Sequence, residues 1–164
     1  MKAVVQRVVD ASVTVDGVLK GSIQSGLLVY LGVALEDTEK DADWLAEKIL
    51  HLRIFNDADG KMNLSLFDVA AESESESSTG ILAISQFTLL GDARKGRRPS
   101  WNFAAPPEKA KKLYEYFITK IRERGVLCAN GEFQAHMKVT YTNDGPVTIL
   151  LDSEQENKRQ AISG

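Results

Sequence analysis

The chain has 164 residues, of which 43% are hydrophobic and 26% charged, and its formal net charge is −3. This length fits one domain with a sizeable core. The charge excludes bulk attraction to nucleic acid, although a local basic patch can still bind phosphate. No apolar run approaches the about 20 residues of a membrane span, and residues 1–7 are too polar for a signal peptide. The single cysteine, Cys128, excludes an internal disulfide, so we expect a cytoplasmic protein without a membrane partner.

The first part of the chain has the pattern of β-strands. Residues 2–9 are apolar and β-branched, and residues 12–15 alternate polar with apolar side chains. Asp16-Gly17 follows, and this pair is typical of a hairpin because both central positions of a type I′ turn need positive φ. The nearly continuous apolar run at 26–34 predicts a central strand.

Two helices are predicted from apolar residues that recur every three or four positions. The first spans 38–52, with an N-cap at Asp37-Thr38. The second spans 107–124, because Pro106-Pro107 suits a helix start and Gly125 suits a helix end.

The rest of the chain is expected to be strands, turns and two polar segments. The acidic Ser/Glu stretch at 72–79 is predicted to be a surface loop, and the polar tail at 152–164 is expected to fray. Further strands are predicted at 81–90, 126–129, 137–142 and 147–151. The turn-forming residues 143–146 separate the last two. We therefore predict one mixed α/β domain over 1–151, with two long helices and largely antiparallel or mixed sheets.

The usual groups of hydrolytic catalysis have no support in the sequence. His51 stands near the end of the first helix and His136 is isolated, and no His, Cys, Asp or Glu cluster has the spacing of metal ligands. We expect neither a metal nor a cofactor. Cys128 follows apolar residues and is expected to be a buried small side chain rather than a nucleophile. Ser85 and Ser100 lack the Gly-x-Ser-x-Gly pattern of serine hydrolases.

A polar segment follows the apolar run 81–84 and precedes a basic loop. Ser85-Gln86-Phe87-Thr88-Leu89 stands where a buried strand should reach the surface. Four of the five residues at 94–98 are basic, namely Arg94, Lys95, Arg97 and Arg98. This loop is either a solvated charged loop or a phosphate-binding loop. The nearby Trp101 and Phe103 favour the second interpretation, because basic groups interleaved with aromatic rings can hold phosphate and stack bases.

Gly145-Pro146 is the second candidate feature. It is either a plain turn between two strands or a cis peptide that redirects the flanking carbonyls. Glycine before the proline lets the backbone approach a ligand closely.

Taken together, these motifs resemble those of the D-aminoacyl-tRNA deacylases, also called D-tyrosyl-tRNA deacylases. The resemblance covers residues 1–151, and its motifs occur in the family's order. They are Gln6-Arg7-Val8, Leu52-Arg53-Ile54-Phe55, Gly60-Lys61-Met62-Asn63-Leu64-Ser65, Ser85-Gln86-Phe87-Thr88-Leu89, Arg97-Arg98-Pro99-Ser100, Gly131-x-Phe133-x-Ala135-x-Met137 and Thr142-Asn143-Asp144-Gly145-Pro146-Val147-Thr148. The chain departs from the family in the 72–78 insertion, in its tail, and at Trp101 and His136.

The resemblance implies a compact β/β/α domain that forms a homodimer, with the active site at the subunit interface. Members remove D-amino acids from the 3′ end of charged tRNA by hydrolysing the ester, and they also act on glycine mischarged to tRNA. The expected partners are therefore a second copy of the chain and the 3′ end of an aminoacyl-tRNA, and not DNA.

The resemblance also implies roles for individual residues. Ser85, Gln86, Phe87 and Thr88 would line the catalytic pocket. We expect the N–H groups of Phe87 and Thr88 to stabilise the negative charge that develops on the ester carbonyl. Thr88 Oγ is either a nucleophile or an orienting group, and the absence of a neighbouring base favours the second role. The terminal 2′-OH of the tRNA would assist the reaction.

The remaining site residues divide between chirality and RNA binding. Gly145-Pro146, in cis, would enter the partner's pocket and exclude an L side chain, and Arg7 would hold that motif. The terminal adenine would lie on apolar surface, and the phosphates would meet basic side chains. The candidates for the adenine are Phe133, Ala135 and Met137, with core packing as the alternative for Phe133 and Met137, and the candidates for the phosphates are Lys95, Arg97 and Arg98.

Two other interpretations of the chain remain open. An RNA-binding module would need the basic loop but neither Thr88 nor a cis Gly145-Pro146. A dimeric adaptor without catalytic activity would use residues 85–89 only as a buried strand.

Overall fold

A computed structural model describes residues 1–71 and 79–154. Most of the predicted acidic loop and of the predicted polar tail lies outside these residues. The last strand continues through Asp152, and Ser153 is buried. None of the helices in the described residues has the length and apolarity needed to cross a membrane.

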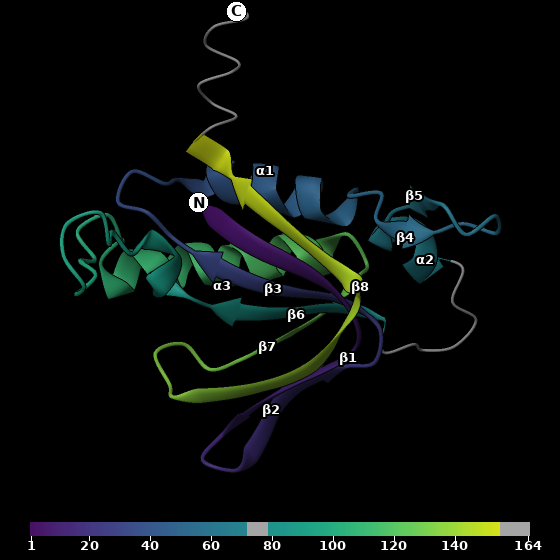
Figure 1. Cartoon of the computed structure of the whole chain (residues 1–164), viewed down its shortest axis with the longest axis horizontal. Helices are drawn as coiled ribbons and strands as arrows, with labels where there is room; N and C mark the ends of the chain where they lie inside the picture. Colours follow the sequence, from purple (N-terminus) through teal and green to yellow (C-terminus); the bar gives the residue numbers. More distant parts are fainter. Residues whose placement is uncertain (72–78, 155–164) are drawn as a thin grey trace, which may run out of the picture.

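A six-stranded mixed sheet organises the fold (Figure 1). Five strands follow the order β2-β1-β3-β6-β7. The sixth, β8, stands outside this order and also pairs with β1. Strand β1 is antiparallel to β2, β3 and β8, whereas β3, β6 and β7 are parallel. The bounds are β1 Lys2–Val15, β2 Val18–Ile23, β3 Gly26–Gly32, β6 Gly80–Ser85, β7 Leu127–Asn130 and β8 Met137–Asp152. A separate small sheet pairs β4 Phe55–Asn56 with β5 Met62–Leu64.

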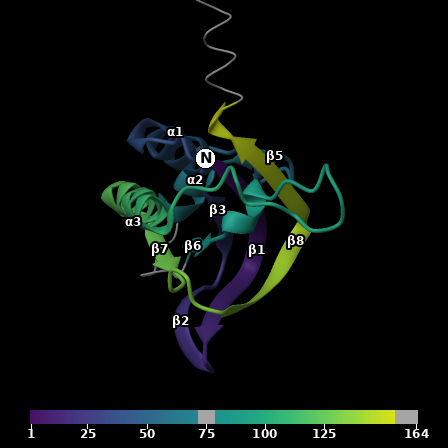
Figure 2. The ribbon, with the colours of Figure 1, turned by 90° about the vertical axis from the view of Figure 1, so that its left-hand side faces the viewer.

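The domain has three layers, because the sheet curls over itself and helices cover its other face (Figure 2). Helices α1 (Glu39–Leu50) and α3 (Pro107–Glu123) cover one face. The later half of β1 curls over the opposite face together with β2 and the first part of β8, and its Val8, Ala11 and Val13 pack on Leu28 and Leu82. The result is the mixed α/β single domain, with its β/β/α layers, that the sequence predicts.

The helices begin and end close to the predicted residues. The N-terminus of α1 is capped because the Thr38 N–H donates to Asp41 Oδ2 at 2.9 Å. Helix α2 (Leu66–Ala71) is not predicted by the sequence analysis, although Ser65 and Asp68 form the same kind of cap. The hairpin turn at Asp16-Gly17 has the positive φ angles expected, 49° and 80°.

Two sequence predictions about strands are wrong. The predicted strand at 81–90 ends at Ser85, and residues Phe87–Leu90 form a single 3₁₀ turn, η1. The predicted strands at 137–142 and 147–151 are one strand, β8, and residues 143–146 lie inside it. The long pairing with β1 keeps this strand continuous, and the register shifts around Val8 absorb the irregular residues.

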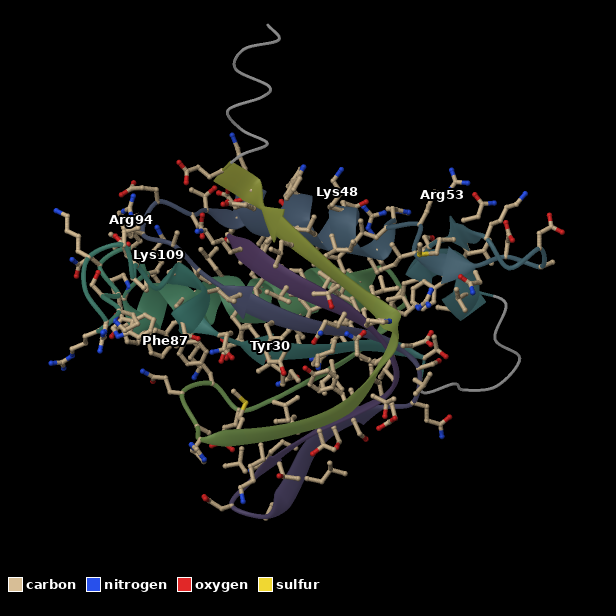
Figure 3. The ribbon with its side chains drawn as sticks, viewed as in Figure 1. Tyr30, Lys48, Arg53, Phe87, Arg94 and Lys109 are labelled. Carbon is tan, nitrogen blue, oxygen red and sulfur yellow. The ribbon has the colours of Figure 1, made fainter. Side chains whose placement is uncertain are left out.

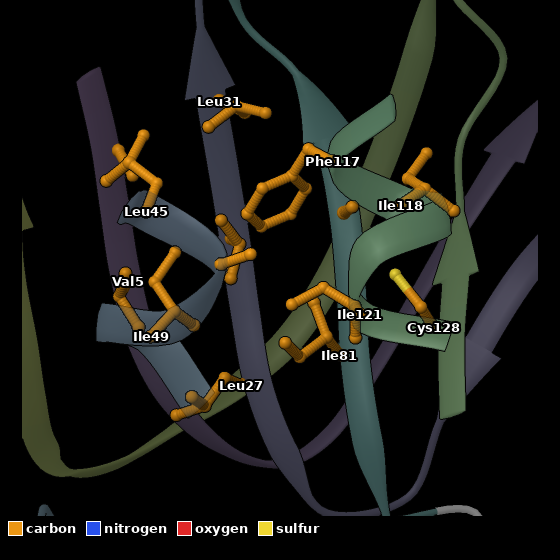
Figure 4. Close-up of a cluster of buried hydrophobic side chains, with 14 of the residues drawn as sticks. Val5, Leu27, Leu31, Leu45, Ile49, Ile81, Phe117, Ile118, Ile121 and Cys128 are labelled. Atoms are coloured by element: carbon orange, nitrogen blue, oxygen red, sulfur yellow. The ribbon is translucent and has the colours of Figure 1, made fainter. Parts of the chain in front are cut away.

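The main core lies between the sheet and the two long helices (Figure 4). Phe117 and Ile121 of α3 and Ile49 of α1 are fully buried against β1, β3 and β6. Cys128 of β7 belongs to the same cluster and is 2% exposed. Burial raises the pKa of its thiol to about 12. Cys128 therefore packs as an uncharged small side chain, as expected.

Candidate active site

A cavity of about 770 Å³ opens at the carboxyl ends of the parallel strands β3 and β6. This is the edge at which ligands commonly bind in sheets of this kind. Residues from four separate segments meet here, and they are far apart in the sequence. The lining includes Leu31 and Val33 at the end of β3, Ser85, Gln86 and Phe87 at the end of β6, Trp101 and residues 104–107 together with Ala110 and Tyr114 of α3, and residues 133–137 at the start of β8.

The structure brings together most of the residues predicted for the pocket. Ser85, Gln86 and Phe87 face the same cavity as Phe133, Ala135 and Met137, which the sequence analysis connects only through the family resemblance. Trp101, Tyr114 and His136 also line the cavity. The sequence analysis does not assign them to the pocket, because only the tertiary fold brings their segments to this strand end.

Backbone contacts fix the η1 turn at the edge of the cavity. The Gln86 N–H donates to the Leu31 carbonyl at 2.8 Å, and the Leu89 N–H donates to the Gln86 carbonyl at 3.2 Å. This close approach needs Gly32, since a Cβ there would lie 2.9 Å from the Gln86 carbonyl oxygen. Phe87 and Thr88 open the turn. Because the first residues of a helical turn lack acceptors within it, their N–H groups are free to bind a ligand.

Thr88 contacts Gln86 beside the cavity. Its Oγ1 accepts a hydrogen bond from Gln86 Nε2, and its side chain is exposed and does not line the cavity. Within the described chain, Gln86 is the one side chain hydrogen-bonded to Thr88 Oγ1. An amide cannot take up the proton of a hydroxyl nucleophile, so this contact favours an orienting role for Thr88.

The segment that leads into β8 forms the apolar wall of the cavity. Phe133 is half-buried, and its ring centroid lies 6.0 Å from that of Tyr114. The Tyr114 hydroxyl donates to the buried Ala83 carbonyl at 2.8 Å, which anchors this contact to β6. Met137 is also half-buried and packs on the buried cluster that includes Val13 and Leu82. Phe133 and Met137 therefore pack against the core and also line the cavity, and binding of adenine to them stays a prediction.

The basic loop extends outward beyond Trp101. Asp92 and Ser100 exchange two backbone hydrogen bonds of 2.9 Å at its base. Arg94 donates to both carboxylate oxygens of Asp92, at 2.8 and 2.7 Å, and these bonds lower the pKa of Asp92 to about 2. The cationic side chains of three exposed loop residues form no ion pair with any described residue: Lys95, Arg97 and Arg98. These are the three cations predicted for phosphate.

Gly145 and Pro146 form an exposed point in β8, and the peptide bond between them is cis. Arg7 lies beneath them and is 8% exposed. Its Nε is 2.9 Å from Asp144 Oδ2, and its Nη1 donates to the Ile54 carbonyl at 2.6 Å. Arg7 thus lies against Gly145, and its role in holding this motif stays a prediction.

Within one chain, Gly145 and Pro146 lie far from the cavity. Lys2 of β1 pairs with Gly32, and Gly32 contacts η1 at the edge of the cavity. Arg7, which lies against Gly145, is five residues further along β1. Because an extended strand rises about 3.4 Å per residue, five residues span about 17 Å. Arg7 contacts Ile54, the neighbour of Arg53, and Figure 3 shows Arg53 and Phe87 at opposite ends of the molecule. One chain therefore does not bring the two predicted halves of the site together.

Residues 4–152 match the family model described as D-Tyr-tRNA(Tyr) deacylase. The chain belongs to this deacylase family. The protein called D-aminoacyl-tRNA deacylase in Kosmotoga olearia is 58% identical over 156 residues, which cover 95% of this chain and 99% of that protein. The protein of the same name in Koribacter versatilis is 57% identical over the same shares. A solved structure called "c-Myc DNA Unwinding Element Binding Protein" is 42% identical, with a TM-score of 0.83, and covers 93% of this chain and 98% of that one.

The deacylase family consists of hydrolases that act on aminoacyl-tRNA esters, so the cavity described above is a candidate hydrolytic site. No group of three or more His, Cys, Asp or Glu side chains within residues 1–71 and 79–154 could hold a metal ion. The polar side chains that line the cavity include the hydroxyl of Ser85, the amides of Gln86 and Gln134 and the imidazole of His136.

Proposed function

We propose that this protein hydrolyses the ester of D-aminoacyl-tRNA, and of glycine mischarged to tRNA, and rejects L-aminoacyl-tRNA. The observation that carries the proposal is the cavity at the end of β6. It combines the η1 turn with an apolar wall large enough for a nucleobase. In this role the protein removes wrongly configured amino acids from cytoplasmic tRNA before they reach translation.

The first chemical requirement is stabilisation of negative charge. Attack of water on the ester carbonyl moves an electron pair onto the carbonyl oxygen. The N–H groups of Phe87 and Thr88 are held at the end of a buried strand and are free of acceptors within their turn. One such prepositioned donor can be worth about 3 kcal/mol in the transition state.

The second requirement is a positioned water molecule. Thr88 Oγ1, itself held by Gln86, orients the water or the substrate. The terminal 2′-OH of the tRNA supplies the additional hydroxyl beside the ester, so the protein needs no dedicated acid or base for this step.

The third requirement is selection by chirality. In the proposed homodimer, Gly145 and Pro146 of one protomer enter the cavity of its partner. Their exposure and their distance from the cavity of their own chain support this arrangement. Main-chain carbonyls of this segment accept hydrogen bonds from the substrate's ammonium group and leave no space for an L side chain. Glycine has no side chain to exclude, so it passes the same filter.

The RNA end occupies the rest of the site. The terminal adenine lies against Phe133, Ala135 and Met137. Lys95, Arg97 and Arg98 bind phosphates, since they are exposed cations that no described carboxylate neutralises.

The proposal is tested by incubating the purified protein with D-Tyr-tRNA and with Gly-tRNA. We expect free D-tyrosine and free glycine to be released together with intact tRNA. Binding of the tRNA without hydrolysis would instead identify an RNA-binding module. If the protein neither binds nor hydrolyses the tRNA, the proposal is wrong and the dimeric adaptor is the interpretation that remains.

Binding of tRNA should weaken with salt, because the bound phosphates release counterions. Replacing Arg97 or Arg98 with alanine should reduce the slope of log Kd against log salt by about 0.7 to 1 for each phosphate that the variant no longer binds. Lys48→Ala is the matched control, since it removes the same charge from the exposed surface of α1 (Figure 3). A slope that changes equally in all three variants would show that the basic loop binds no phosphate specifically.

A further inference from the structure

Trp101 stands at the boundary between the cavity and the basic loop, and the proposed reaction gives it no role. It lines the cavity, yet 40% of its surface is exposed. Its ring centroid lies 5.2 Å from that of Phe87, with an interplanar angle of 71°. An aromatic ring that packs by its edge and keeps surface open to solvent is available for stacking.

The position of this ring is fixed by the backbone around it. A Cβ at Gly91 would lie 2.7 Å from Trp101 Cζ3, so the ring lies directly against a residue that has no side chain. The Ala104 N–H donates to the Trp101 carbonyl at 3.0 Å, and the Ala105 N–H donates to the Val33 carbonyl at 2.9 Å. These bonds join the segment to the end of β3, so the ring is held rigidly at the cavity mouth.

The charge beside the ring favours a polyanion. Arg97 and Arg98 precede Trp101 by four and three residues, and neither pairs with a described carboxylate. Cations next to an exposed aromatic ring form the usual surface for single-stranded nucleic acid, in which the cations meet the backbone and the ring stacks on a base.

From this arrangement we infer that Trp101 stacks on the base of the nucleotide that precedes the terminal adenosine. The inference rests on the proposed function, because it takes the adenosine to occupy the cavity. An RNA chain that leaves the cavity toward Arg97 and Arg98 passes Trp101 first. Stacking makes no demand on base identity, since every base has an aromatic face. Trp101 is therefore a positioning residue for the tRNA end, outside the chemistry itself.

The test compares a long substrate with a short one. D-Tyr-tRNA carries the preceding nucleotide and D-tyrosyl-adenosine does not. We expect Trp101→Ala to lower the ratio of kcat/KM between the long and the short substrate about tenfold, the size of one base–aromatic stack. Trp101→Phe should restore most of this ratio. Phe67→Ala is the matched control, because Phe67 is an aromatic residue of α2, 39% exposed and outside the cavity lining, and it should leave the ratio unchanged.

The same variants separate failure of this inference from failure of the proposed function. If Trp101→Ala lowers kcat/KM equally for both substrates, or for neither, Trp101 has no stacking role even though the protein is a deacylase. If the wild-type protein hydrolyses neither substrate, binding decides. An oligonucleotide matching the last three nucleotides of tRNA should then quench the Trp101 fluorescence of a Trp44→Phe variant, and an absence of quenching would overturn the inference.

Discussion

Replacing Phe87 with proline is expected to lower kcat for D-Tyr-tRNA by about 10²- to 10³-fold relative to Phe87→Ala, the loss that follows removal of one oxyanion donor. Phe87 is the first residue of η1, where the fixed φ of proline fits and its missing N–H breaks no bond of the turn. Gln86 before it lies outside the α-helical region, with φ −144° and ψ 78°, and the α-helical region is the one that a following proline disfavours. The substitution therefore deletes mainly the N–H that we assign to the oxyanion.

Phe87→Ala is the matched control because it removes the same ring and its contact with Trp101 but keeps the N–H. Thermal unfolding of both variants should occur at similar temperatures, since the Phe87 side chain is 56% exposed. Equal kcat values for the two variants would contradict a role for this N–H. A difference confined to KM would assign it to substrate binding instead.

A second large effect is expected when two inactive variants are combined. In Gly145→Ala the new Cβ meets Val147 Cγ2 at 2.7 Å, at a position whose φ is +121°, so the exposed segment must move. Phe87→Pro damages the other half of the site. If each site takes one half from each protomer, a dimer of the two variants has one intact site and one doubly damaged site. Random mixing gives about half heterodimers, and the activity should recover to about a quarter of the wild-type value.

Purified heterodimers, obtained with a different affinity tag on each variant, sharpen this experiment. They should show about half of the wild-type activity per dimer, because one of two sites is intact. Each variant mixed with itself supplies the baseline. If the activity of the mixtures never exceeds the average activity of the two parent variants, each chain builds its own site. The proposed exchange of Gly145 and Pro146 between protomers would then be wrong.

The sequence predicts the elements whose signal is local. Both long helices follow from the spacing of their apolar residues, and Thr38 and Gly125 lie at the predicted ends. The hairpin at Asp16-Gly17 follows from the need for positive φ. Each of these elements forms because neighbouring residues agree on one local structure.

The errors occur where distant contacts override the local signal. Residues 143–146 have a turn composition, but pairing with β1 on both sides keeps them in one strand. Residues 81–90 are predicted to form one strand, yet Gly32 of a neighbouring strand allows the close approach of the turn that follows Ser85.

The candidate site divides in the same way. The motif around Gln86 and the exposed Gly145-Pro146 are recognisable in the sequence through the family resemblance. Tyr114 and His136 are not, and Trp101 is recognisable only as a neighbour of the basic loop, because the fold alone brings these three residues to the end of β6. The distance between Gly145 and the cavity also requires the structure, and it is this distance that supports a site shared between two copies.

The central claim is that the protein discriminates by the chirality of the amino acid. Its most direct test measures kcat/KM for D-Tyr-tRNA and L-Tyr-tRNA with the same enzyme preparation and the same tRNA. We predict rapid hydrolysis of the D ester and hydrolysis of the L ester at a rate near that of the uncatalysed reaction. Equal rates with the two esters, or faster hydrolysis of the L ester, would contradict the proposal.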